Sequence, residues 1–118
     1  MDYIFRLPKF PVLLDTGDSL ILAKSRAQLD AKISKLTFSD NSKRDIIDSR
    51  AEGFSLYPEK MFVAPNITTR RWTKLNIIGL FNSKRKPGTP ELRSTSLGSR
   101  SLEQIVCEAA ELLSQSKV

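Results

Sequence analysis

The chain contains no histidine and a single cysteine, Cys107. Without histidine the commonest catalytic base and transition-metal ligand is missing, and one cysteine cannot form an internal disulfide. Zinc centres and catalytic pairs of histidine with serine or cysteine are therefore excluded or nearly so. We expect a protein that is not an enzyme and that holds no metal and no cofactor.

Long apolar segments are also missing. The longest apolar runs, such as Ile77-Ile78 with Leu80-Phe81, are far shorter than the roughly 20 residues that cross a bilayer. The first residues show no basic segment followed by an apolar one, so we predict no secretory signal and a cytoplasmic protein without membrane contact. With 118 residues, 40% of them hydrophobic and 27% charged, the chain is expected to form one domain over 1–118.

Positive charge is concentrated in one third of the chain. Residues 61–100 contain eight Lys and Arg residues and one acid, Glu91, a net charge of +7, while the whole chain carries +6. A field of one sign attracts an acidic partner, whether protein, nucleic acid or anionic surface. Residues 83–100, rich in Ser, Lys, Arg, Pro and Gly, predict a basic irregular loop inside this segment.

The apolar pattern of the first half predicts short strands. They are expected over an extended segment at 3–14 and over 19–23, 45–48, 54–57 and 61–63. Asp15-Thr16-Gly17-Asp18 is typical of a turn, and it makes a hairpin of the first two strands. The strand at 61–63 lies between Pro58 and Pro65 and is expected at a sheet edge, because proline cannot donate to a ladder.

Helical spacing of apolar residues predicts three helices, over 26–36, 72–82 and 102–115. Capping boxes precede the first and the last, at Ser25 with Gln28 and at Ser101 with Gln104. The middle helix is expected to be buried, with Gly79 allowing close packing. We therefore predict an α+β fold in which an antiparallel sheet of about five strands carries all three helices on one face.

By elimination, the sequence favours a small non-catalytic protein-binding protein of inhibitor, immunity or accessory type. It would recognise an acidic protein partner through its basic segment, where Trp and Arg are the residue types that dominate binding energies. The predicted partner-binding residues are Arg70, Arg71, Trp72, Lys84, Arg85, Lys86 and Arg93.

A nucleic-acid-binding protein is the first alternative. Arg70 and Arg71 adjoin Trp72, and the Lys84-Arg85-Lys86 run follows Phe81. Cations neutralise phosphates and an aromatic face can stack on a base, so this mixture is typical of proteins that bind single strands.

A second alternative comes from two short motifs. Asp15-Thr16-Gly17 follows the apolar run Val12-Leu13-Leu14, and Asn76-Ile77-Ile78-Gly79 occurs farther along the chain. Together they resemble the retropepsin-like aspartic proteases, in which an apolar strand presents Asp-Thr-Gly and an apolar-apolar-Gly segment supports the catalytic turn. The resemblance implies a half-site monomer that dimerises, with Asp15 as its catalytic residue. Two such carboxylates would share one proton, one acting as base on water and the other as acid.

Overall fold

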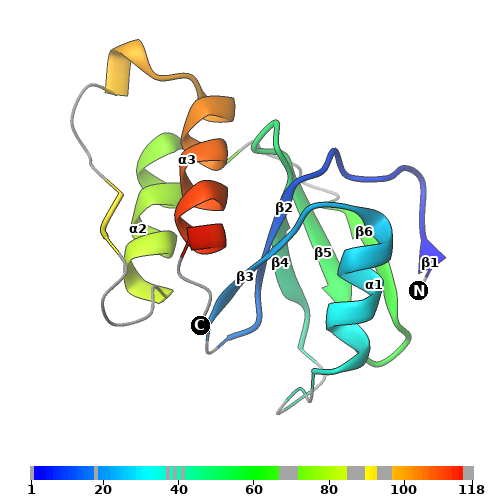
Figure 1. Ribbon diagram of the computed structural model, residues 1–118. Coiled ribbons are helices and arrows are strands. Elements are labelled where there is room, and N and C mark those ends of the chain that lie inside the picture. The colour runs from blue at the N-terminus through cyan, green and yellow to red at the C-terminus, as the bar shows by residue number, and fades with distance from the viewer. Residues whose placement is uncertain are drawn as a thin grey trace.

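A six-stranded sheet in the order β1-β6-β5-β4-β2-β3 forms the centre of the structure (Figure 1). The computed structural model describes residues 2–17, 19–36, 38, 40, 42–66, 72–84, 90–92 and 97–115. The strands in this part of the chain are β1 (Asp2–Tyr3), β2 (Val12–Asp15), β3 (Leu20–Ala23), β4 (Arg44–Ile47), β5 (Gly53–Tyr57) and β6 (Phe62–Pro65). The helices are α1 (Arg26–Ser34), α2 (Lys74–Lys84) and α3 (Leu102–Gln115), with a 3₁₀ turn at Leu97–Ser99.

The sheet is mixed, which corrects the prediction of an antiparallel one. Strands β2 to β6 pair antiparallel, whereas β1 pairs parallel with β6 and places Tyr3 opposite Val63. The expected edge strand at 61–63 is therefore covered by β1, and β3 lies at the opposite edge. The predicted extended segment over 3–14 is divided into β1 and β2. Pro8 and Pro11 lie in the interval between them, and they cannot donate to a ladder.

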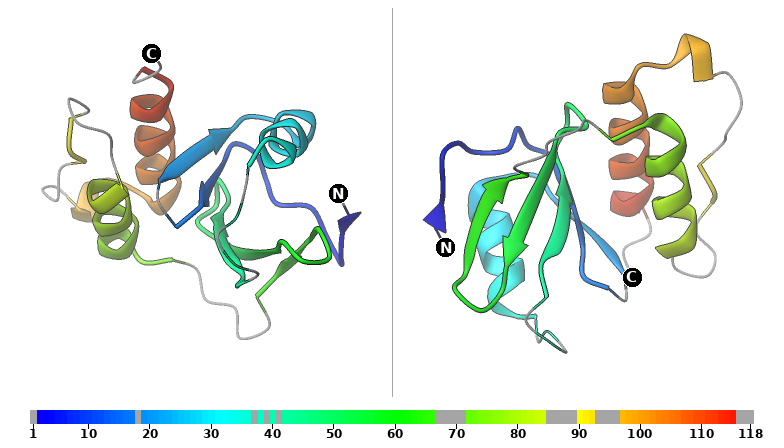
Figure 2. Two further views of the ribbon diagram at one scale, coloured as in Figure 1. Left: turned by 90° about the horizontal axis from the view of Figure 1, so that it is seen from below. Right: turned by 180° about the vertical axis from the view of Figure 1, so that it is seen from behind.

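The helices cover both faces of the sheet, so the prediction of three helices on one face is wrong. Figure 2 shows α1 on one side and α2 with α3 on the other. Leu13 and Ile47 belong to the core beneath α2 and α3, whereas their neighbours Leu14 and Ile46 belong to the core beneath α1. Successive side chains of a strand point to opposite faces, so a strand buried on both faces is apolar without alternation.

The predicted helix ends are largely confirmed. Ser25 accepts from the Gln28 backbone N–H at 3.1 Å at the start of α1, and Ser101 and Gln104 form a reciprocal capping box before α3. The predicted bounds of α3 agree with the observed ones, whereas α2 begins and ends two residues later than predicted. These helices begin where a side chain satisfies otherwise unpaired N–H groups.

Helix α2 is only half buried, contrary to the prediction. Its Ile77, Ile78 and Phe81 are buried, but Leu75 is 61% exposed. A Cβ added at Gly79 would meet nothing within 4 Å, so this glycine serves no close packing.

Part of the predicted loop at 83–100 is ordered structure. Ser83 and Lys84 are helical, and Leu92 is buried with both backbone polar groups bonded to the Asn82 side chain, at 2.8 and 3.2 Å. The predicted loop therefore begins too early, because residues 83 and 84 belong to α2.

Candidate docking surface

The structure describes two of the seven predicted partner-binding residues, Trp72 and Lys84. The other five lie outside the described residues: Arg70, Arg71, Arg85, Lys86 and Arg93. The role of the seven residues in partner binding therefore stays a prediction.

Trp72 is half-buried and packs against the core beneath α2 and α3. Its backbone N–H donates to the Ala51 carbonyl at 2.7 Å. Its indole Nε1 lies 3.2 Å from the position that a Cβ on Gly53 would occupy, and the Asn66 amide nitrogen lies 2.7 Å from it. Glycine leaves room here for the indole edge, so part of the tryptophan surface is already used in packing.

Lys84 ends α2 and contacts the turn between β2 and β3. Its ammonium lies 3.8 Å from the Asp15 carboxylate and donates to the Gly17 carbonyl. Asp15 in turn accepts from the Gly17 backbone N–H at 2.9 Å, and Gly17 has a φ of +98°. Asp15 thus stabilises its own turn, a common role for aspartate before glycine.

A second carboxylate lies beside Asp15 in the same chain. The register that places Leu14 opposite Ile46 places Asp15 opposite Asp45. The pKa of the Asp45 carboxyl is raised by burial; the Lys43 charge lowers it, and the Asp15 charge raises it further.

No group of three metal-ligating side chains occurs among the described residues. The protease alternative for Asp15 stays a prediction.

An apolar patch surrounds β1. Ile4 is 38% exposed, Phe5 89%, Leu7 45% and Met61 36%. Ile4, Phe5 and Leu7 follow β1 within four positions of the chain. Met61 adjoins β1, because the Asp2 N–H donates to the Met61 carbonyl at 3.3 Å and the Ile4 N–H donates to the Val63 carbonyl at 2.8 Å. We call these four residues the N-terminal patch. Clustered exposed apolar side chains mark interaction sites on otherwise polar surfaces.

Phe5 is presented by an unusual backbone turn. Its φ is +72°, and the Arg6 N–H donates to the Ile4 carbonyl at 2.9 Å. A hydrogen bond that closes over one residue with positive φ makes a γ-turn of the rare, strained kind. Strain of this type persists only where the surrounding structure enforces it, and it often accompanies function.

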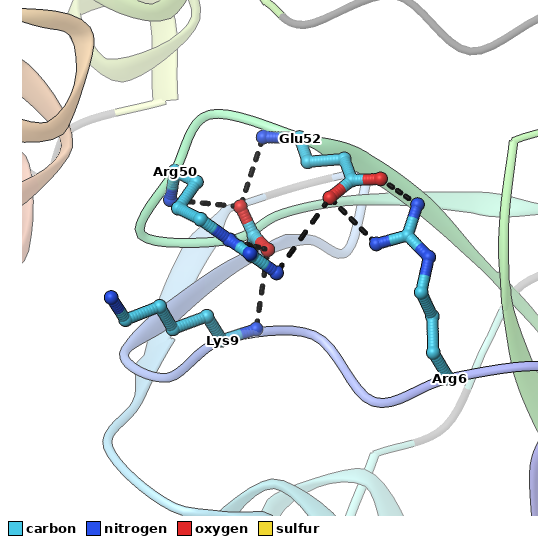
Figure 3. A network of polar contacts seen from close by, with 5 residues as sticks. Arg6, Lys9, Arg50 and Glu52 are labelled. Carbon is cyan, nitrogen blue, oxygen red and sulfur yellow. Dashed lines mark hydrogen bonds and ion pairs between the residues drawn. The ribbon is translucent and has the colours of Figure 1, made fainter.

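A polar network holds the chain that follows Phe5 (Figure 3). The Arg6 guanidinium donates through two nitrogens to the Glu52 carboxylate and lies 5.2 Å from the centre of the Phe54 ring. Three residues farther on, the Lys9 N–H donates to the Asp48 carboxylate at 3.2 Å. Both acids belong to the turn between β4 and β5, so this turn holds residues 6–9, which directly follow Phe5.

Asp48 is the anchor of this network. It is fully buried, and its carboxylate also accepts from the Arg50 and Glu52 backbone N–H groups, each at 2.9 Å. Burying a carboxylate costs free energy unless hydrogen-bond donors compensate for the lost water. The three N–H groups that donate to Asp48 provide this compensation.

Charge beside the patch is of both signs, and the two arginines there are ion-paired with acids of the turn between β4 and β5. The side chains of Arg6 and Arg50 are 45% and 47% exposed, while those of Glu52 and Asp48 are 16% and 0% exposed. Lys9 and Lys60 are also exposed, and so are the carboxylates of Asp2 and Glu59.

Sequence reasoning missed the N-terminal patch because Tyr3, Phe5 and Leu7 alternate as in a strand. Pro8, which directly follows Leu7, was the available signal against a continuous strand.

No helix among the described residues is long and apolar enough to cross a membrane. No family model, curated protein or solved structure matches this chain.

Proposed function

We propose that this chain is a non-catalytic protein-binding protein whose partner has an apolar pocket rimmed by acidic groups. The observation that carries the proposal is Phe5, 89% exposed on a strained turn and flanked by other exposed apolar side chains. Aromatic residues supply much of the binding energy when they enter a partner's pocket. A backbone already held in its bound conformation loses little further conformational freedom on binding.

The charge of the partner is inferred from the net charge of the whole chain, which is +6. Arg6 and Arg50 beside the patch are partly exposed, although both are already ion-paired with Glu52. Acidic groups around the pocket would steer association and fix its register. The predicted basic residues from Arg70 to Arg93 would add to this long-range attraction.

The test is a capture experiment with matched variants. The protein is immobilised through Cys107, its one cysteine, which is exposed on α3. Phe5→Ser is compared with Leu75→Ser, which removes another exposed apolar side chain, on α2. We expect the immobilised wild type to retain a partner protein from a cell lysate, whether or not the lysate is treated with nuclease. The Leu75→Ser variant should still retain this protein, and the Phe5→Ser variant should not.

Two results would contradict the proposal. Retention that is equal for wild type and Phe5→Ser would show that the N-terminal patch is not the contact. Material that disappears on nuclease treatment would instead support the nucleic-acid alternative, whose binding must weaken steeply with salt.

A further inference from the structure

A small groove lies between β3 and α3, on the face of the sheet that α2 and α3 cover. Its lining is mostly apolar and includes Leu22 and Ala110, which are 7% and 8% exposed. Its volume of about 320 Å³ is at the lower end of the ~300–1,000 Å³ that is typical of small-molecule sites. None of its lining residues belongs to the N-terminal patch, so the groove is a separate candidate site for a small ligand.

The hairpin of β2 and β3 brings two further residues to the groove. Val12 pairs with Ala23, so the same register continued by one position places Pro11 beside Lys24. Alternate side chains of a strand share a face, which puts Lys24 on the same side as Leu22, toward α3. Pro11 and Lys24 both line the groove.

Small side chains on α3 leave the groove open. Ala110 and Ser114 both line it, and because they are four positions apart they lie one above the other on the same side of the helix. Nearer the start of α3, Ile105 and Val106 are fully buried in the core. Large side chains thus fill the space beneath the first turns of α3, whereas small ones leave space free near its end.

Two exposed side chains of opposite charge, Lys24 and Glu111, complete the lining. The described residues offer neither side chain an ion pair or a hydrogen bond, and the same holds for the Ser114 hydroxyl. A cation, an anion and a hydroxyl are therefore available to a ligand beside an apolar surface.

We propose that this groove binds a small zwitterion with an aliphatic side chain, of the class of the free apolar α-amino acids. The aliphatic part packs against Leu22 and Ala110, Lys24 binds the carboxylate, and Glu111 binds the ammonium group. A simple carboxylic acid would bring its charge near Glu111, and a simple amine would bring its charge near Lys24. Like charges placed together oppose binding, so the pair of side chains favours a ligand that carries both charges.

The probe is L-leucine, compared with 4-methylpentanoate, which lacks the ammonium group, and 3-methylbutylamine, which lacks the carboxylate. Binding is followed in isotope-labelled protein by the backbone amide signals in NMR spectra, up to about 10 mM ligand. We expect L-leucine to shift the Leu22 and Ala110 amide signals. It should bind at least about threefold more tightly than either analogue, as exposed charge pairs allow.

Variants separate the contributions of charge and space. Lys24→Met should raise the Kd of L-leucine at least about threefold without weakening the amine, and Glu111→Gln should do so without weakening 4-methylpentanoate. Ser114→Trp, which fills the groove, should weaken all three ligands at least about tenfold. Lys60→Met and Leu75→Trp change exposed positions outside the groove and should leave every Kd unchanged.

No shifts at about 10 mM L-leucine, equal binding of either analogue, or shifts that Ser114→Trp leaves unchanged would each overturn the inference. Shifts at Phe5 and Leu7 in place of Leu22 and Ala110 would also overturn it, because they would assign the ligand to the N-terminal patch. The same spectra report whether each variant is folded, and the two charge variants alter exposed side chains only.

Discussion

The Lys84 ammonium lies 3.8 Å from the Asp15 carboxylate and also donates to the Gly17 carbonyl, so it joins the end of α2 to the turn between β2 and β3. One member of the predicted basic surface therefore makes an intramolecular contact.

We predict that Lys84→Met lowers the free energy of unfolding by about 1 kcal/mol. The variant keeps the length of the side chain but removes its charge and its hydrogen bond to a carbonyl. Urea denaturation measures the change, and Lys60→Met, at an exposed position before β6, is the control. Equal stability of the two variants would show that the contact with the turn contributes nothing.

Asp48→Ala should lower the free energy of unfolding by about 3 kcal/mol or more. The substitution leaves the backbone N–H groups of Lys9, Arg50 and Glu52 without their buried acceptor. Thermal or urea denaturation measures the loss. Asp40→Ala removes an exposed carboxylate from a surface loop and should cost much less. A similar loss in both variants would contradict the role of Asp48 as an anchor.

Asp45→Asn should stabilise the protein at neutral pH. Burial raises the pKa of this carboxyl above its value in the unfolded chain, and the Asp15 charge contributes in the same direction. The folded state therefore binds the proton more tightly, and stability is lost as pH rises from below the unfolded pKa through the folded one. The stability of Asp45→Asn relative to wild type should increase over this acidic range. A difference that does not vary between pH 3 and pH 7 would contradict this prediction.

Phe5→Gly should raise the free energy of unfolding by about 1 kcal/mol, because glycine adopts a φ of +72° without strain. Phe5→Ala, which keeps the strain and removes the ring, separates the effect of the backbone from that of the side chain. Denaturation curves of the three proteins provide the measurement. Lower stability of Phe5→Gly than of Phe5→Ala would show that the turn is not strained. A stabilised Phe5→Gly that no longer binds the partner would be direct evidence that the phenylalanine is kept for binding.

Local sequence signals predicted most of the elements. The strands at 19–23, 45–48, 54–57 and 61–63 were each placed within two residues of β3 to β6, and α3 was placed at its observed bounds. Turn residues and helix caps act over three or four positions, so a linear reading detects them. The parallel pairing of β1 with β6 was not predicted, because it joins residues about sixty positions apart through two residue pairs.

The candidate surface was not predictable in the same way. Phe5 reads as one apolar residue in an alternating segment, and its exposure follows from the γ-turn that Arg6, Glu52 and Asp48 help to hold. Trp72 was predicted as a partner-binding residue, and its partly buried position depends on Gly53, in another element. Burial results from contacts between distant segments, which local periodicity does not report.

The sequence by itself determined the α+β class, the absence of histidine chemistry, the caps of α1 and α3 and the excess of positive charge, because these depend on composition or on near neighbours. Only the tertiary structure decided that helices cover both faces of the sheet, that Lys84 contacts Asp15, and that Phe5 remains exposed. These features depend on which segments meet in space, where packing and hydrogen bonding of distant residues outweigh local preference.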